Sequence, residues 1–133
     1  MPIRIVRLGT PRATGEGTRI GTVRRPPRGV PKAEFASRDY YDVWYPLLAP
    51  TQELMTQGQQ VPAGPEGDKD WQAFVQHFRK ELAQPEASRT LDLLTALSQH
   101  SAMSVGCYCE DESCCHRSVL RAELLARGAS VEG

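Results

Sequence analysis

The sequence predicts a small α/β fold in which a short, mainly parallel sheet is flanked by helices. Three observations lead to this fold class: a strand-like segment near the N-terminus, an amphipathic helix in the middle, and a strand followed directly by a helix near the C-terminus. Strands and helices in this order are typical of layered α/β proteins. The length of 133 residues suits one hydrophobic core, so we expect a single domain over residues 1–133.

Two strands are expected in the first part of the chain. Residues 3–8 alternate between apolar and basic side chains, and residues 18–23 are rich in β-branched residues. Glycine and proline fill the stretch 9–17 between them, so we predict a hairpin. Residues 24–31 carry three prolines and three arginines, which indicates a basic loop without regular structure.

Three helices are expected next. Thr51 should cap a short helix that reaches Gln59. A longer helix with Asp70 as its N-cap follows from the helical spacing of its apolar residues, which are Trp71, Phe74, Val75, Phe78 and Leu82. Ser88 should cap a third helix, whose core-facing residues are expected to be Leu91, Leu93, Leu94 and Leu97.

A strand over 103–109 and a helix over 115–127 should complete the fold. Gly128 stands where a left-handed residue ends a helix, and residues 129–131 read as the stub of a last strand. No apolar run is long enough to span a bilayer, and the N-terminus does not resemble a signal peptide, so we expect no membrane partner and a cytoplasmic location.

Charge is distributed unevenly although the net charge is zero. Residues 1–38 contain nine Lys/Arg and two Asp/Glu, and the remainder contains seven and fourteen. This division favours an anionic partner for the first part, unless the two parts neutralise each other in the fold. The arginines at 19, 24, 25 and 28 are candidates for phosphate contacts, whereas core packing is the expected role of Trp44 and Trp71.

All four cysteines lie between Cys107 and Cys115, which argues for reduced thiols and for metal or thiol chemistry. Cys107 and Cys109 should leave the same face of a strand. With Ser113 as the N-cap, the amides of Cys115 and His116 would form an anion site at the helix start.

Three interpretations of this segment remain open. Cys115 or Cys109 is a nucleophile, with His116 as acid or base and Arg117 holding an anionic substrate. Alternatively, Cys107, Cys109, Cys115 and His116 bind zinc, although their spacing differs from that of zinc knuckles. In the third interpretation, the cysteines pack in the core and Arg117 pairs with the acidic residues 110–112. Those acidic residues are most simply solvated.

The chain resembles the DUF488 family of bacterial and archaeal proteins. The resemblance rests on residues 19–30, on Tyr41-Asp42-Val43-Trp44 with Ala49-Pro50-Thr51 and Leu54, on Trp71 with Phe74, and on Cys107-Tyr108-Cys109 with Cys115-His116-Arg117. It implies a small α/β fold and a site built from the basic loop, the Asp42–Trp44 element and the Cys-His-Arg turn, but it supplies no reaction.

From these observations we expect a domain that binds a phosphate-bearing or other anionic ligand, for example a nucleotide or nucleic acid, between the loop 24–28 and the helix start at 115–117. The candidate ligand-binding residues are Arg117, Ser118, Arg24, Arg28, Asp42 and Trp44. The alternatives are a zinc-binding module and a non-enzymatic interaction protein.

Overall fold

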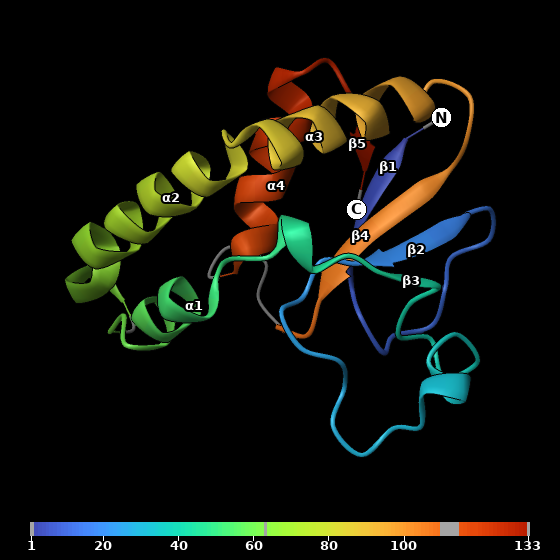
Figure 1. Cartoon of the computed structure of the whole chain (residues 1–133), viewed down its shortest axis with the longest axis horizontal. Helices are drawn as coiled ribbons and strands as arrows, with labels where there is room; N and C mark the ends of the chain where they lie inside the picture. Colours follow the sequence, from blue (N-terminus) through green and yellow to red (C-terminus); the bar gives the residue numbers. More distant parts are fainter. Residues whose placement is uncertain (1, 63, 110–114, 133) are drawn as a thin grey trace.

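A computed structural model describes residues 2–62, 64–109 and 115–132, and it contains a sheet of five parallel strands (Figure 1). The order across the sheet is β3-β2-β4-β1-β5. The strands are β1 (Ile3–Arg7), β2 (Thr18–Gly21), β3 (Val43–Trp44), β4 (Met103–Cys107) and β5 (Val131–Glu132). The α/β fold class predicted from the sequence is therefore confirmed.

The predicted hairpin between the first two strands is wrong. Strands β1 and β2 do not pair with each other, because β4 lies between them and pairs with both in parallel. Met103 is opposite Ile3 on one side and Thr18 on the other. Every residue of β4 is buried, which is what a central strand of a parallel sheet requires. The turn-rich segment 9–17 therefore crosses over β4 on its way from β1 to β2, instead of forming a tight turn between two paired strands.

The helices in the described ranges are α1 (Gln52–Gln59), α2 (Asp68–Leu82), α3 (Pro85–Leu97) and α4 (His116–Ala126). Short 3-10 turns occupy Lys32–Glu34, Pro46–Leu48 and Pro65–Gly67. Figure 1 shows α1 lying beside α2, and the two helices are in contact. None of the described helices has the length and apolar character needed to cross a membrane.

Helices and strands share one main core. Its buried side chains include Ile3, Ile5, Met103 and Val105 from the sheet and Phe78, Leu82, Leu91, Leu120 and Leu124 from the helices. The helical spacing from Trp71 to Leu82 is thereby confirmed. The expectation for the third helix is only half right, because Leu93 and Leu97 are 57% and 45% exposed while Leu91 and Leu94 are buried.

Helix starts differ in part from the predicted ones. Thr51 caps α1 as expected, since its hydroxyl accepts a hydrogen bond from the Leu54 amide at 3.4 Å. Helix α2 begins at Asp68, not after Asp70, because the preceding 3-10 turn leads directly into it. Helix α3 begins at Pro85 instead of after Ser88, since the fixed φ of proline suits the first helical position.

The chain end follows the prediction. Gly128 has a φ of 92° and ends α4, and the Ala129 amide returns to the Leu124 carbonyl at 3.0 Å. Val131 and Glu132 then form β5 beside β1.

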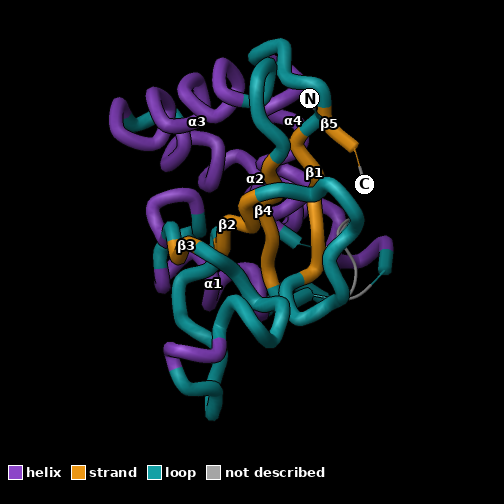
Figure 2. Tube along the Cα trace, turned by 90° about the vertical axis from the view of Figure 1, so that its right-hand side faces the viewer, coloured by secondary structure: helices purple, strands orange, loops and turns teal. Residues whose placement is uncertain are grey.

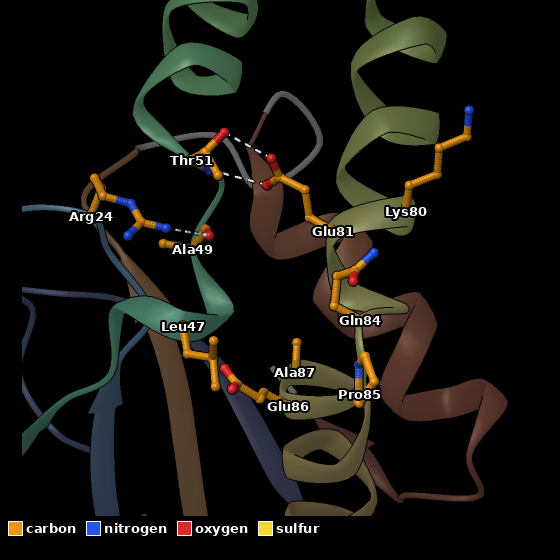
Figure 3. A pocket seen from close by; sticks show the side chains of 10 residues that line it. All are labelled: Arg24, Leu47, Ala49, Thr51, Lys80, Glu81, Gln84, Pro85, Glu86 and Ala87. Carbon is orange, nitrogen blue, oxygen red and sulfur yellow. Dashed lines mark hydrogen bonds between the residues drawn. The ribbon is translucent and has the colours of Figure 1, made fainter.

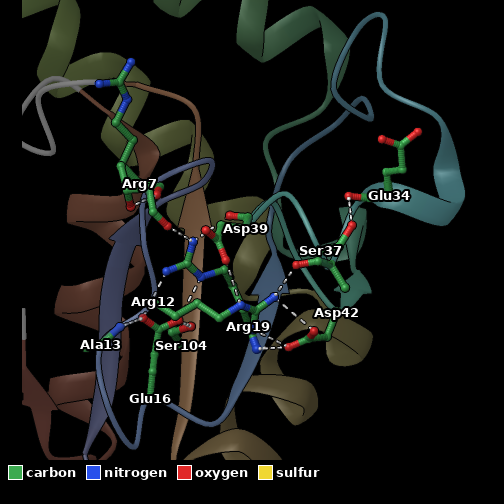
Figure 4. Close-up of polar contacts among 12 residues, drawn as sticks. Arg7, Arg12, Ala13, Glu16, Arg19, Glu34, Ser37, Asp39, Asp42 and Ser104 are labelled. Carbon is green, nitrogen blue, oxygen red and sulfur yellow. Dashed lines mark hydrogen bonds and ion pairs between the residues drawn. The ribbon is translucent and has the colours of Figure 1, made fainter.

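A buried polar network lies on the face of β4 opposite Met103 and Val105, where loop segments pass in front of the strands in Figure 2. Arg19 is fully buried and donates to both carboxylate oxygens of Glu16 and to the carbonyls of Thr10 and Asp39, at 2.7–3.0 Å (Figure 4). Ser104 donates to the same carboxylate at 2.8 Å. Arg19 therefore braces the loops, and it is not available for the phosphate contact expected from the sequence.

Candidate functional site

The connections after β2 and β4 diverge at the carboxyl ends of these neighbouring strands. The chain leaves β2 toward β3 at one edge of the sheet, whereas it leaves β4 through α4 toward β5 at the other. Open α/β sheets bind their ligands in the crevice at such a topological switch point. The connection after β2 includes the basic loop 24–31, and the connection after β4 carries Cys109 and Cys115.

A cavity of about 440 Å³ opens at this point. Its wall combines the basic loop, the end of β4, the start of α4 and one side of α1. The lining residues are Val23, Arg24, Arg25, Arg28, Gln52, Met55, Gln59, Cys107, Tyr108, Cys109 and His116. Arginines and cysteines that were separate candidates in the sequence therefore line one cavity. Nothing in the sequence indicated that α1 contributes to it.

Three cysteine sulfurs lie within 4.8 Å of one another, those of Cys107, Cys109 and Cys115. Cys107 is the last residue of β4, and Cys109 lies beyond the strand, not within it as predicted. Cys107 and Cys115 are buried and Cys109 is exposed. The sulfur that solvent and ligands can reach is therefore that of Cys109.

Hydrogen bonds within the cluster make its thiols unequal. Contacts with Cys107 and then Cys115 lower the pKa of Cys109, and the nearby guanidinium of Arg117 acts in the same direction. The pKa of Cys107 is raised by its bonds to Cys109 and Cys115. For Cys115, the bond with Cys107 lowers the pKa, but the bond to Cys109 and burial raise it more. These opposite shifts favour the thiolate of Cys109 over those of Cys107 and Cys115.

His116 lies beneath this cluster with a fixed orientation. Its Nε2 is 2.6 Å from the Thr22 carbonyl, so Nε2 carries the hydrogen, and Nδ1 faces the Cys115 sulfur at 3.7 Å. Burial is the main cause of a lowered pKa for His116, although the Thr22 carbonyl and Cys109 act against it. The Cys107–Cys109–Cys115 group does not include a nitrogen of His116, so the predicted four-ligand metal set is reduced to three thiols.

The start of α4 differs from the predicted one. The helix begins at His116 with Cys115 as the N-cap, so Cys115 is not a first-turn residue, and Ser113 lies outside the described residues. The amide and hydroxyl of Ser118 both donate to the Cys115 carbonyl, at 3.0 and 2.9 Å. Arg117 is 4% exposed and donates to the Cys109 carbonyl at 2.6 Å. These two side chains hold the backbone of the cysteines and do not line the cavity.

The basic loop is tied to its surroundings by its own arginines. Arg24 donates to the carbonyls of Pro50 and Ala49 at 2.9 and 3.0 Å, and Arg25 donates to Gln52 at 3.2 Å. Tyr108 donates to the Arg25 carbonyl at 2.9 Å, which joins the loop to the end of β4. Arg25 and Arg28 are exposed, so they supply the positive charge at the cavity mouth.

Asp42 is occupied elsewhere. Its carboxylate accepts hydrogen bonds from Arg12 at 2.8 and 3.0 Å and from the Arg19 amide at 2.8 Å. The bond from Arg12 is the main cause of a lowered pKa for Asp42. Neither Asp42 nor Trp44 lines the cysteine cavity, so the site implied by the family resemblance is divided in two.

The two tryptophans differ from each other. Trp71 stacks on Phe74 with ring centroids 4.9 Å apart and packs against the core, as expected. Trp44 is 44% exposed, so the expected core role does not describe it.

A larger cavity of about 640 Å³ lies between the start of α1 and the junction of α2 and α3 (Figure 3). Glu81 accepts hydrogen bonds there from the hydroxyl and amide of Thr51, and Arg24 reaches the Ala49 carbonyl. Among the residues that the structure describes, no cysteine or histidine lines this cavity, so the smaller cavity with its cysteines and arginines remains the candidate site. The acidic residues 110–112 and Cys114 lie outside the described residues.

Comparison with known proteins gives one result at the level of family. No curated protein and no solved structure matches the chain. A family model described as the active DUF488-N3 subclade matches residues 3–128, which include both connections of the switch point and all three clustered cysteines. The chain therefore belongs to the DUF488 family, as its sequence motifs indicated.

Proposed function

We propose that this protein binds an anionic, phosphate-bearing ligand in the cavity at the switch point and presents the Cys109 thiolate to it. The observation that supports the proposal most is that Arg24, Arg25 and Arg28 line the same 440 Å³ cavity as Cys107 and Cys109. Guanidinium groups favour phosphate and carboxylate groups, and they also stabilise a thiolate.

The proposal differs from the sequence-based one in the roles of the residues. Of the two candidate nucleophiles, Cys115 and Cys109, the proposal retains Cys109, because only Cys109 is exposed within the cluster. The sulfurs of Cys107 and Cys115 lie within 4.8 Å of its sulfur, and Arg117 positions its backbone. His116 supports Cys115 from below and acts as a positioning residue.

Two alkylating reagents that differ in charge test the proposal, and this test does not require the ligand to be known. Iodoacetate is an anion and iodoacetamide is neutral, so the ratio of their rates reports the local positive charge. Peptide mass spectrometry should find Cys109 alkylated first at pH 6, with a rate ratio shifted toward iodoacetate relative to free glutathione. The matched control is Cys109→Ser, in which this fast modification should disappear.

Arginine variants test the anion-binding part. A unit charge about 8 Å from the reagent contributes about 1 kcal/mol at an effective dielectric of about 40, between the protein-surface and bulk-water values, or roughly fivefold in rate. Arg28→Gln should therefore lower the iodoacetate rate about fivefold and leave the iodoacetamide rate nearly unchanged. Arg38→Gln, an exposed charge outside the cavity lining, should change neither rate. Equal effects of both arginine variants would contradict the proposal.

The second candidate function is a metal site, favoured by the three sulfurs within 4.8 Å. Tetrahedral zinc with Zn–S distances of about 2.3 Å places its sulfurs about 3.8 Å apart, which small side-chain rotations would allow here. Three thiolates with the cavity at the fourth position correspond to the open coordination of catalytic zinc sites.

Metal analysis of protein purified without an affinity tag tests this candidate. One equivalent of zinc, lost in Cys107→Ser and retained in a variant of the exposed His77, would support it. Metal content well below one equivalent after growth with added zinc would remove it. The two candidates also differ in reactivity, since zinc would slow the alkylation of Cys109.

A further inference from the structure

The basic loop borders another cavity, of about 480 Å³, besides the 440 Å³ cavity at the switch point. Of these two cavities along the loop, the switch-point cavity is the first and this one is the second, and different residues line it. Its wall is mainly apolar and aromatic, and it also includes Lys32 and Asp42. The other lining residues are Pro26, Pro27, Val30, Ala33, Phe35, Ala36, Tyr41 and Trp44. Arg25 and Arg28 line the first cavity, and Pro26 and Pro27, which separate them in the sequence, line the second. The two cavities therefore share one loop as a common wall.

Trp44 is fixed in an exposed position at this cavity. Its Nε1 donates to the Val23 carbonyl at 2.8 Å, while 44% of the residue remains accessible. An indole that is oriented by a hydrogen bond and still open to solvent offers a rigid surface for stacking at little entropic cost. Core packing does not explain this arrangement.

Tyr41 is also among the residues that line this cavity, and it carries a buried polar group. The residue is 3% exposed, its ring packs edge-on against Phe35 with centroids 5.2 Å apart, and its hydroxyl has no hydrogen-bond partner among the described residues. A buried hydroxyl without a partner is costly, and such groups call for a ligand or a water molecule.

We propose that this second cavity binds the base of a nucleotide, stacked on Trp44 and hydrogen-bonded by Tyr41, with the phosphate held by the arginines across the loop. The evidence for base binding is the set of residues that line the second cavity, whereas phosphate binding by the arginines rests on the function proposed above. A planar heterocycle suits the aromatic and proline walls, and its polar edge suits the Tyr41 hydroxyl. Pro26 and Pro27 at the second cavity are sequence neighbours of Arg25 and Arg28 at the first, so one loop would contact both the base and the phosphate.

Fluorescence of Trp44 tests this inference directly. In the Trp71→Phe background Trp44 is the only tryptophan, and we would titrate the variant with AMP, UMP, adenosine, uridine and inorganic phosphate. We expect saturable quenching by the nucleotides, weaker binding of the nucleosides and no quenching by inorganic phosphate. Tyr41→Phe, which removes no hydrogen bond within the described protein, should weaken nucleotide binding about three- to tenfold.

The outcomes separate this inference from the proposed function. If no nucleotide or nucleoside quenches Trp44 at millimolar concentration while the iodoacetate preference persists, the base site is overturned and the anion site stands. Quenching by nucleosides without an iodoacetate preference would support the base site and remove the anion site. A single-stranded pentanucleotide distinguishes the source of the base: tighter binding than AMP indicates a nucleic acid strand, weaker binding a free nucleotide, and both support the base site.

Discussion

Replacing Glu16 by glutamine should destabilise the protein at neutral pH far more than replacing an exposed carboxylate. The change leaves Arg19, which is fully buried, without its charge partner. Removing one member of a buried ion pair typically costs about 3–5 kcal/mol, because the remaining charge is desolvated and uncompensated. The loops that carry Tyr41 and Asp42 would lose their bracing at the same time.

Titration of Glu16 gives an independent magnitude. Burial alone would raise its pKa, but hydrogen bonds from Arg19, Ser104 and the Ala13 amide lower it from 4.5 to about 2. A lower pKa in the folded state stabilises the protein above pH 4.5, and this contribution is lost as the pH falls toward 2. Since each pKa unit corresponds to about 1.4 kcal/mol, the full contribution is about 3 kcal/mol, of which about 2 kcal/mol is lost by pH 3.

Urea unfolding followed by circular dichroism at pH 7 and pH 3 measures both effects. Wild type should lose about 2 kcal/mol more than Glu16→Gln between these pH values, and the two proteins should approach each other in stability at low pH. Glu34→Gln, at an exposed carboxylate, serves as the control and should unfold like wild type. Equal pH dependence of wild type and Glu16→Gln would refute the assignment of a buried, ionised Glu16.

Four further substitutions test the packing and one helix cap. Leu91→Ala should cost about 2–5 kcal/mol in urea unfolding, whereas Leu93→Ala should stay within about 0.5 kcal/mol, since Leu91 is fully buried and Leu93 is 57% exposed. Gly21→Ala should displace Tyr41, because an added Cβ would lie 2.3 Å from its ring, and a shifted tyrosine signal in near-UV circular dichroism checks this. Thr51→Ala should lower stability by about 1 kcal/mol through loss of the α1 cap, and an unchanged melting temperature would contradict that role.

Local sequence patterns predicted helices well and strand partners poorly. The spacing from Trp71 to Leu82 and the left-handed Gly128 are local signals, so they held in the structure. Pairing of β1 and β2 depends on β4, which comes more than eighty residues later in the chain, and the glycine-rich segment 9–17 therefore suggested the wrong neighbour. The prediction that Leu93 faces the core failed for another reason. Helix α3 has more leucines than its buried face accommodates.

The sequence by itself determined the family, the α/β class and two of the segments that line the candidate site, because these follow from residue types and their spacing. Only the tertiary structure decided what each residue does there. Arg19 and Asp42 are charges held by partners distant in the sequence, and Arg117 holds a carbonyl instead of lining the cavity. Cys109 became the exposed thiol because the packing of β4 and α4 buried the other two clustered sulfurs, and burial is a property of the whole fold.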